Sequence, residues 1–402
     1  MDIRPFHAIR PTRDKAYLVA TRSYVSYSEE MLRDKLLNNP YTFLQIIHPD
    51  RYGEPQSHGM ERFRKVRERF DEFADRGIFL EESAPAFYVY SQVHADRSHT
   101  GVIAAVAIQD YLNGHIKVHE HTLHEREEMF RDYLEVTGFN AEPVLLSHPR
   151  NQRIVELVHQ CSQERAEYEF TSTDGILHLM WPVSDANFVR ELTEAYAALP
   201  DLYIADGHHR TASSALLHQS VPNKSNAYFM AMLMDESEMH FSAFSRMVRH
   251  SYRSLAAVKK AIQTHFEVEE TMGPRDLQGA EMQLYGEGKW FNLRLKADVE
   301  IPHDPVGRLN PSLVAKYILN EVFDIFDQRR DERLAFLPDT DHGHSLQQAI
   351  DSGKYEFGIR MGSLSGKDVR AVADAGEVMP PKSTYIEPKL RSGLLIYSLR
   401  DE

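Results

Sequence analysis

A short apolar run that ends directly in Asp206-Gly207-His208-His209-Arg210, the 206–210 loop, constrains the fold of this chain more than any other feature. Residues 202–205 have the length and composition of a buried strand, and residues 211–217 favour a helix. Gly207 permits a tight turn between these two elements. The first N–H groups of the predicted helix then lie beside the strand end, where the helix dipole favours an anion. The pattern therefore predicts a strand–turn–helix unit with an anion site at its turn.

The side chains of the 206–210 loop suit a phosphate. Arg210 offers a planar fork to phosphate oxygens, and His208 and His209 can donate hydrogen bonds. Asp206 is a candidate Mg²⁺ ligand, or a group that orients a histidine. The alternative is an aspartate that caps the helix, followed by surface histidines. The residues alone leave these two interpretations open.

A histidine-rich segment, residues 115–124, is the second candidate site. If residues 115–121 are extended, alternation places one lysine and three histidines on one face: His115, Lys117, His119 and His121. Glu120 lies beside these groups and is a candidate general base for a substrate hydroxyl. Two alternatives stay open. His119 and His121 have a spacing that suits a metal ion, and the segment also fits a polar edge strand in a chain with 21 histidines.

A third candidate lies in residues 380–393, which combine cations, hydroxyls and a glycine. Lys382, Ser383 and Thr384 are candidate substrate-binding residues, because such a loop can grip a phosphate or a carboxylate. The loop lacks the glycine spacing of a P-loop. A solvent-exposed basic loop is the alternative.

Composition excludes several classes of protein. The chain carries 46 Lys and Arg against 60 Asp and Glu, and its net charge of −14 argues against a nonspecific nucleic-acid binder. The single cysteine, Cys161, excludes an intramolecular disulfide and a four-cysteine zinc site. The longest apolar runs, residues 102–108 and 229–234, are too short to span a membrane. We therefore expect a cytoplasmic protein without nucleic-acid or membrane partners, and we leave a homodimer open.

Helix and strand patterns alternate along the chain without a low-complexity linker. Apolar spacings of three and four predict a helix over residues 60–76. Residues 86–93 and 100–108 read as an antiparallel strand pair, and residues 228–234 as a buried strand. The pattern predicts an α+β protein with intertwined parts.

The sequence resembles domain-of-unknown-function family 1015 from residue 3 to about residue 397. The segments that carry the resemblance are Ile3-Arg4-Pro5-Phe6, residues 39–44, His119-Glu120-His121-Thr122, Glu142-Pro143-Val144, residues 204–210, residues 373–384 and Glu387-Pro388-Lys389-Leu390. The chain departs from the family at Arg22-Ser23-Tyr24-Val25, where members carry Pro-Tyr-Asp-Val. The missing aspartate puts any metal or substrate role of that position in doubt.

The 206–210 loop also resembles the phosphate-binding loop of the ParB/sulfiredoxin-like superfamily, which includes free-serine kinases. The resemblance implies a ParB/sulfiredoxin-like core with an insertion over residues 86–245. Mainly helical N-terminal elements (residues 1–85) and C-terminal α/β elements that close the site (residues 246–402) would flank this core. It also implies that Glu120 is the catalytic base and that the loop grips phosphate and metal.

The resulting hypothesis is a nucleotide-dependent phosphotransferase that uses ATP or ADP with Mg²⁺, and free L-serine is the best single substrate. The expected catalytic residues are Glu120, Asp206 and His209. The expected nucleotide-binding residues are Lys117, Gly207, His208, His209, Arg210 and Thr211. The expected substrate-binding residues are His119, His121, Lys382, Ser383 and Thr384, with Asp206 as the metal ligand. A phosphoester hydrolase and a nonenzymatic nucleotide-binding regulator are the two alternatives.

Overall fold

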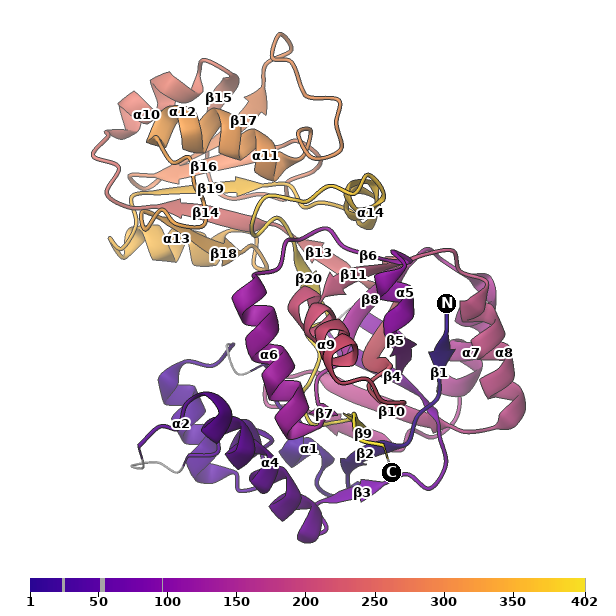
Figure 1. The fold of residues 1–402 in the computed structure, drawn as a ribbon. Helices are drawn as coiled ribbons and strands as arrows, with labels where there is room; N and C mark the ends of the chain where they lie inside the picture. Colours follow the sequence, from indigo (N-terminus) through magenta and orange to yellow (C-terminus); the bar gives the residue numbers. More distant parts are fainter. Residues whose placement is uncertain (24–25, 51–54, 96, 402) are drawn as a thin grey trace. The chain divides into compact units, whose positions relative to one another are not determined.

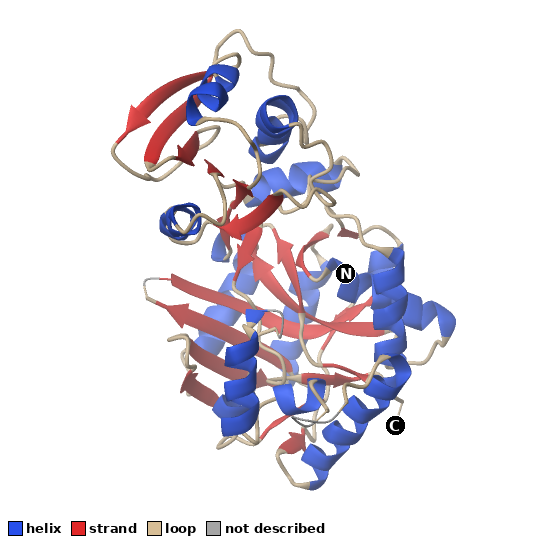
Figure 2. Ribbon diagram, turned by 90° about the vertical axis from the view of Figure 1, so that its left-hand side faces the viewer, coloured by secondary structure: helices blue, strands red, loops and turns tan. Residues whose placement is uncertain are grey.

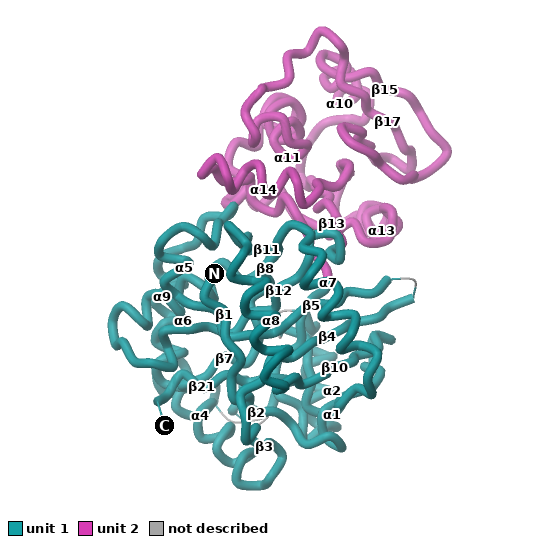
Figure 3. Tube along the Cα trace, turned by 90° about the vertical axis from the view of Figure 1, so that its right-hand side faces the viewer, with its two compact units in different colours: residues 1–239, 388–402 teal, residues 240–387 magenta. Residues whose placement is uncertain are grey.

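The computed structural model describes residues 1–23, 26–50, 55–95 and 97–401, and the chain in it forms two compact units. Unit 1 contains residues 1–239 together with 388–402, and unit 2 contains residues 240–387 (Figure 3). Helices and several separate sheets confirm the predicted α+β class. The predicted division at residues 85 and 245 stays a prediction. Tyr24 and Val25, part of the predicted departure from the family, lie outside the described residues.

Strands of unit 1 gather into a large central sheet (Figure 2). This main sheet is mixed and, in the described part of the chain, has nine strands. These are β1 (Ile3–Arg4), β4 (Phe87–His94), β5 (Arg97–Ala107), β6 (Ile116–Lys117), β8 (Val144–His148), β9 (Tyr168–Thr171), β10 (Leu177–Val183), β11 (Leu202–Asp206) and β12 (Tyr228–Asp235). Their order is β6-β11-β8-β12-β5-β4-β10-β9, with β1 on β5. The antiparallel β4–β5 pair and the buried strand β12 confirm two sequence predictions.

A small sheet of unit 1 binds the chain's C-terminal segment into the fold. It consists of β2 (Ala8–Pro11), β3 (Phe79–Glu81), β7 (Phe139–Asn140) and β21 (Ile396–Ser398). The order is β3-β2-β21-β7, so that β21 lies between strands from the first half of the chain. Residues 388–402 therefore complete unit 1 after the chain has formed unit 2.

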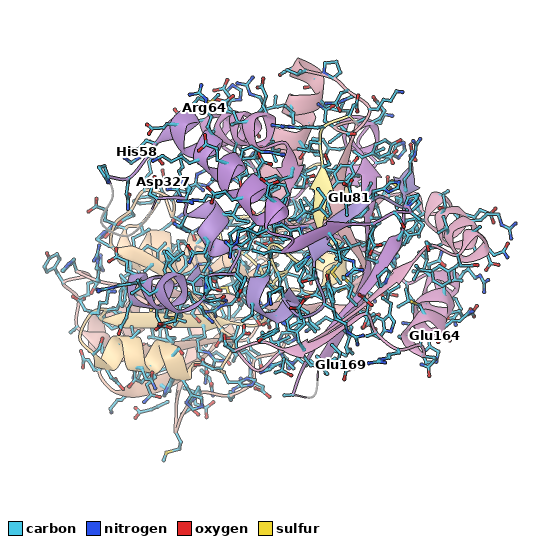
Figure 4. All side chains as sticks on the ribbon, turned by 90° about the horizontal axis from the view of Figure 1, so that it is seen from below. His58, Arg64, Glu81, Glu164, Glu169 and Asp327 are labelled. Carbon is cyan, nitrogen blue, oxygen red and sulfur yellow. The ribbon has the colours of Figure 1, made fainter. Side chains whose placement is uncertain are left out.

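The helices of unit 1 differ in length and in how far their side chains are buried. They are α1 (Ala16–Val19), α2 (Glu29–Asn38), α3 (Leu44–Ile47), α4 (Gly59–Asp75), α5 (Ile108–Leu112), α6 (His124–Thr137), α7 (Gln152–Ser162), α8 (Ala186–Ala197) and α9 (His208–Ser220). Helix α4 confirms the prediction for residues 60–76 and buries Val66, Phe70 and Phe73. Exposed side chains such as Arg64 and Glu164 lie on the outside (Figure 4).

Unit 2 has its own sheets and core. Its strands are β13 (His240–Ser242), β14 (Phe244–Val248), β15 (Phe266–Thr271), β16 (Met282–Gly286), β17 (Lys289–Leu295), β18 (Leu334–Pro338), β19 (Phe357–Met361) and β20 (Tyr385–Glu387). They form a sheet in the order β15-β17-β16-β19-β14-β18 and a separate β13–β20 pair. The α-helices are α10 (Leu255–Ile262), α11 (Asn310–Val314), α12 (Glu321–Phe323), α13 (His344–Asp351) and α14 (Gly366–Asp374), and a π-helix over Ala315–Asn320 joins α11 to α12.

Local sequence explains the strand–turn–helix unit around Gly207. Leu202 and Ile204 are buried in β11, and Gly207 has a φ of +105°, a conformation that side-chain-bearing residues rarely adopt. Helix α9 begins directly after it and lies beside α6 (Figure 1). The predicted strand–turn–helix is confirmed. No helix in the described part of the chain is long and apolar enough to cross a membrane.

Candidate functional site

The N-terminus of α9 offers unpaired backbone donors at the end of β11. The N–H of Thr211 donates to the carbonyl of Gly207 at 3.0 Å and closes the first turn. Within the described residues, the N–H groups of His208, His209 and Arg210 have no protein acceptor. These are the donors that a helix leaves unused at its start, and the helix dipole adds positive potential there. The start of α9 can therefore bind an anion.

The second candidate segment meets this helix start through two histidines. The backbone N of His119 lies 3.4 Å from Nε2 of His208, and the two rings meet edge to face with centroids 4.6 Å apart. Only 4% of His119 and 6% of His208 is exposed. Because Nε2 of His208 accepts this hydrogen bond, the proton of the neutral ring belongs on Nδ1.

Glu120 lies on the proton-bearing side of His208. Its Oε2 is 3.8 Å from Nδ1 of His208, and 57% of the Glu120 side chain is exposed. A carboxylate that is both close to the helix start and open to solvent can meet a substrate hydroxyl. The structure thus brings Glu120 and the 206–210 loop together within unit 1.

The histidines at this site are neutral at neutral pH. Burial lowers the pKa of His119 to about 4. Burial, with His119 as a second cause, holds the pKa of His208 well below its usual range. Burial and the nearby Arg126 also lower the pKa of His209. These rings therefore supply hydrogen-bonding groups rather than positive charge.

Two buried ring nitrogens point to a missing partner. Nδ1 of His119 and Nδ1 of His209 are buried, and neither has a hydrogen-bond partner in the described part of the protein. Buried polar atoms are almost always paired, since an unpaired one costs about 1–3 kcal/mol. Both atoms belong to residues next to the α9 N-terminus, so a bound ligand is a reasonable source of the missing hydrogen bonds.

Arg210 contacts acidic and main-chain groups of unit 1. Its Nη2 lies 2.6 Å from Oδ2 of Asp206, and its Nη1 lies 2.7 Å from Oε1 of Glu142. Nη1 also donates to the carbonyls of Pro143 at 2.7 Å and of Glu142 at 3.3 Å. Ser392 donates to the other oxygen of Glu142 at 2.8 Å. The guanidinium thus fixes the position of the loop.

Asp206 forms ion pairs with two cationic side chains in this structure. Besides Arg210, Nζ of Lys389 lies 3.0 Å from Oδ1 of Asp206. Burial alone would raise the pKa of Asp206, but Lys389 and Arg210 outweigh it, so the pKa of this carboxyl is lowered. Because both oxygens contact cations, Asp206 does not fit the role of an Mg²⁺ ligand in this arrangement. The described residues also contain no group of three His, Cys, Asp or Glu side chains that could hold a metal ion.

Other predicted residues of unit 1 lie in different surroundings. The strand β6 covers only Ile116–Lys117, so residues 115–121 do not form the expected face: His119 is buried, whereas His115 and His121 are exposed. The expected alternation is wrong because the chain leaves the sheet after Lys117 to reach α9. Lys117 pairs with Asp201 at 3.2 Å.

Thr211 is fully buried within α9. Its hydroxyl lies 3.3 Å from the carbonyl of Gly207, and its exposed fraction is 0%. In this position, the Thr211 side chain supports the turn. A direct contact with a nucleotide stays a prediction.

The third candidate loop divides between the two units. Lys382, Ser383 and Thr384 belong to unit 2, and Lys389 belongs to unit 1. Lys382 has a φ of +55°, and its ammonium lies 5.2 Å from the ring centre of Phe244. Ser383 donates to the carbonyl of Pro380 at 2.7 Å. A substrate role for these three residues stays a prediction.

Sequence reasoning did not assign Glu142, Lys389 and Ser392 to the site. Their partners are distant in sequence, and no local spacing connects them to the 206–210 loop. A weaker signal was present, because Glu142 and Lys389 both lie in segments that carry the family resemblance.

Comparison with known proteins places the chain in one family. The family described as "Protein of unknown function (DUF1015)" matches residues 3–313. A search of curated proteins found no match. The assignment to the ParB/sulfiredoxin-like superfamily stays a prediction.

Several solved structures share a weak similarity. A free serine kinase in complex with AMP is 13% identical with a TM-score of 0.36, and the match covers 74% of this chain and 92% of that chain. SbnI with a C-terminal truncation from Staphylococcus aureus is 13% identical with a TM-score of 0.40, covering 74% and 87%. A conserved hypothetical protein from Pyrococcus furiosus is 14% identical with a TM-score of 0.35, covering 75% and 98%. Similarity at this level supports no conclusion about activity.

Proposed function

The chain belongs to the family of proteins of unknown function DUF1015, and we propose that it transfers a phosphoryl group from a nucleotide to a small hydroxyl substrate. The observation that carries this proposal is the position of Glu120. Its carboxylate lies 3.8 Å from the ring of His208, the first residue of α9, whose backbone donors have no protein acceptor in the described structure. An anion site and an open carboxylate side by side are what a phosphoryl transfer requires.

Binding of the donor begins at the start of α9. The backbone N–H groups of His208, His209 and Arg210 donate to phosphate oxygens, and Gly207 supplies the positive-φ turn that lets α9 begin at the end of β11. Nδ1 of His119 and of His209, both buried without a partner among the described residues, complete the set of groups around the anion. In this proposal the phosphates belong to ATP or ADP.

Transfer then needs a base and an aligned acceptor. The oxygen of the substrate hydroxyl attacks the terminal phosphorus, and Glu120 accepts the proton that this hydroxyl loses. The bond between that phosphorus and the bridging oxygen of the leaving nucleotide breaks, and the nucleotide keeps the electron pair. The N-terminal donors of α9 stabilise the negative charge on the transferred group. No step of the transfer is assigned to Mg²⁺, because Arg210 and Lys389 already contact both oxygens of Asp206.

Free L-serine is our first choice of acceptor, and the resemblance of the 206–210 loop to that of free-serine kinases supports it. The test is incubation of the purified chain with L-serine and either ATP or ADP, followed by detection of O-phosphoserine by mass spectrometry. We expect phosphoserine together with an equal amount of the shortened nucleotide. No phosphorylated product from serine or from a panel of small hydroxyl compounds would contradict the proposal.

Two further measurements distinguish the alternatives. A phosphoester hydrolase would release inorganic phosphate from phosphoserine without a nucleotide. A nonenzymatic regulator would bind the nucleotide, as measured by calorimetry, without turnover of any acceptor.

A further inference from the structure

Lys389 reaches the 206–210 loop from the far end of the chain. It lies in the segment that returns from unit 2 to unit 1, and its ammonium is 3.0 Å from Oδ1 of Asp206. About two fifths of the side chain (41%) is exposed. Gln92 on β4 donates to the main-chain carbonyl of Lys389 at 3.2 Å. The backbone is therefore held at the site, and part of the side chain remains exposed to solvent.

Two further contacts fix the same segment on unit 1. Nη2 of Arg391 binds both oxygens of Asp174 at 2.7 and 2.9 Å. Ser392 binds Glu142, the carboxylate that also holds Arg210. These contacts attach the segment that contains Lys389 to unit 1, so the fold fixes the position of Lys389.

Lys389 and Arg210 differ in what they can do for a ligand. Arg210 also holds the main-chain carbonyls of Glu142 and Pro143, so turning it toward a ligand would break contacts that position the loop. An ammonium on a flexible four-carbon stem is a compact charge with three donors, so it can bind a second anion while it stays on Asp206. Lys389 is thus the cation better suited to contact an incoming phosphate next to Gly207.

We propose that the Lys389 ammonium takes, at Oδ1 of Asp206, the place that a divalent cation would otherwise occupy, and that it contacts the bound phosphate. This inference rests on the proposed function, since it concerns the same phosphate site. Phosphate binding at the 206–210 loop is then independent of a metal ion. The Asp206 carboxylate holds the ammonium in position, and the phosphate is the second anion that it contacts.

Calorimetric titration with ADP, in buffer containing EDTA, tests this inference on the full chain. The wild type binds ADP without a metal ion. Lys389→Met weakens binding about tenfold to a hundredfold, the effect of losing one charge-assisted hydrogen bond. Excess Mg²⁺ restores part of the affinity of Lys389→Met, because Oδ1 of Asp206 is then open to a cation. Lys389→Arg retains the charge and binds in EDTA.

Lys289→Met is the matched control, because Lys289 forms an exposed pair with Glu270 at 3.3 Å in unit 2. It leaves ADP affinity unchanged, and thermal unfolding shows whether Lys389→Met is folded. Should Lys389→Met not fold, Lys389→Arg and the wild type decide the question by their binding in EDTA.

Two results would overturn the inference and leave the proposed function standing: wild-type binding that appears only with Mg²⁺, or equal ADP affinity of wild type and folded Lys389→Met in EDTA. A wild type that binds neither ADP nor ATP under either condition would instead overturn the proposed function, and this inference with it.

Discussion

The backbone N–H of His119 donates to Nε2 of His208, 3.4 Å away, and this contact joins two segments that lie far apart in the sequence. One segment carries the candidate base Glu120, and the other carries the helix start that can bind a phosphate. The hydrogen bond also sets the tautomer of His208, so that its Nδ1–H faces Glu120. This hydrogen bond therefore brings the segment with Glu120 and the 206–210 loop into a single candidate site.

Glu120→Gln tests the base. The amide cannot accept the hydroxyl proton, so we expect the transfer rate to fall about 10²- to 10⁴-fold, the usual contribution of general base catalysis. ADP affinity should change little, because Glu120 has no part in the backbone donor set of α9. Steady-state kinetics and calorimetry measure the two quantities. The control is Glu125→Gln, an exposed glutamate in the first turn of α6. A Glu120→Gln enzyme with the wild-type rate would exclude Glu120 as the base.

Gly207→Ala tests the turn. The residue has a φ of +105°, and an added Cβ would lie 3.1 Å from Nε of Arg210. We expect a loss of about 1–3 kcal/mol in the free energy of unfolding, together with weaker ADP binding. Gly77→Ala is the matched control, because Gly77 has a φ of +65° and nothing lies within 4 Å of its added Cβ. Urea unfolding of both variants gives the comparison. Equal losses would mean that the Arg210 contact contributes nothing.

Arg210→Lys tests the network that positions the loop. A lysine keeps the charge but cannot bind Asp206, Glu142 and the carbonyl of Pro143 at the same time. We expect a loss of about 1–3 kcal/mol in the free energy of unfolding. Arg253→Lys changes an exposed pair with Asp324 in unit 2 and should cost less than about 1 kcal/mol. Unfolding in urea, monitored for both units, separates the two outcomes. A fully stable Arg210→Lys would show that the fork is dispensable.

His119 predicts a pH dependence of stability. Burial lowers its folded-state pKa to about 4, whereas the unfolded-state value is about 6.5. The neutral ring therefore contributes stability above pH ~6.5, and this contribution is lost as the pH falls toward the folded-state pKa. Between pH 7 and pH 5, His119→Gln should lose less stability than the wild type, by up to roughly 2 kcal/mol.

Urea midpoints at the two pH values measure this difference. His115→Gln, at an exposed position on the same segment, is the control and should follow the wild type. If His119→Gln and the wild type lost equal stability on acidification, burial of His119 would not explain any acid sensitivity.

Local sequence was sufficient to predict the helices, strands and turns that short-range patterns specify. The apolar run of β11, the turn at Gly207 and the start of α9 follow from short-range patterns, because strand burial and a positive φ are properties of a few neighbouring residues. Helix α4 and the β4–β5 pair were predictable for the same reason. The sequence alone also predicted an anion site at the turn, since a helix start exposes its donors wherever it occurs, and this site stays a prediction.

Tertiary structure decided which groups surround that turn. The alternation expected for residues 115–121 failed because His119 leaves the sheet to pack on His208, and no local pattern records that contact. The sequence determined the strand–turn–helix unit at Gly207 and predicted an anion site there. Only the tertiary structure placed Glu120 beside this turn and brought Lys389 to Asp206. Burial in the folded chain also made the neighbouring histidines neutral. These features depend on packing and desolvation by residues that lie far apart in the sequence.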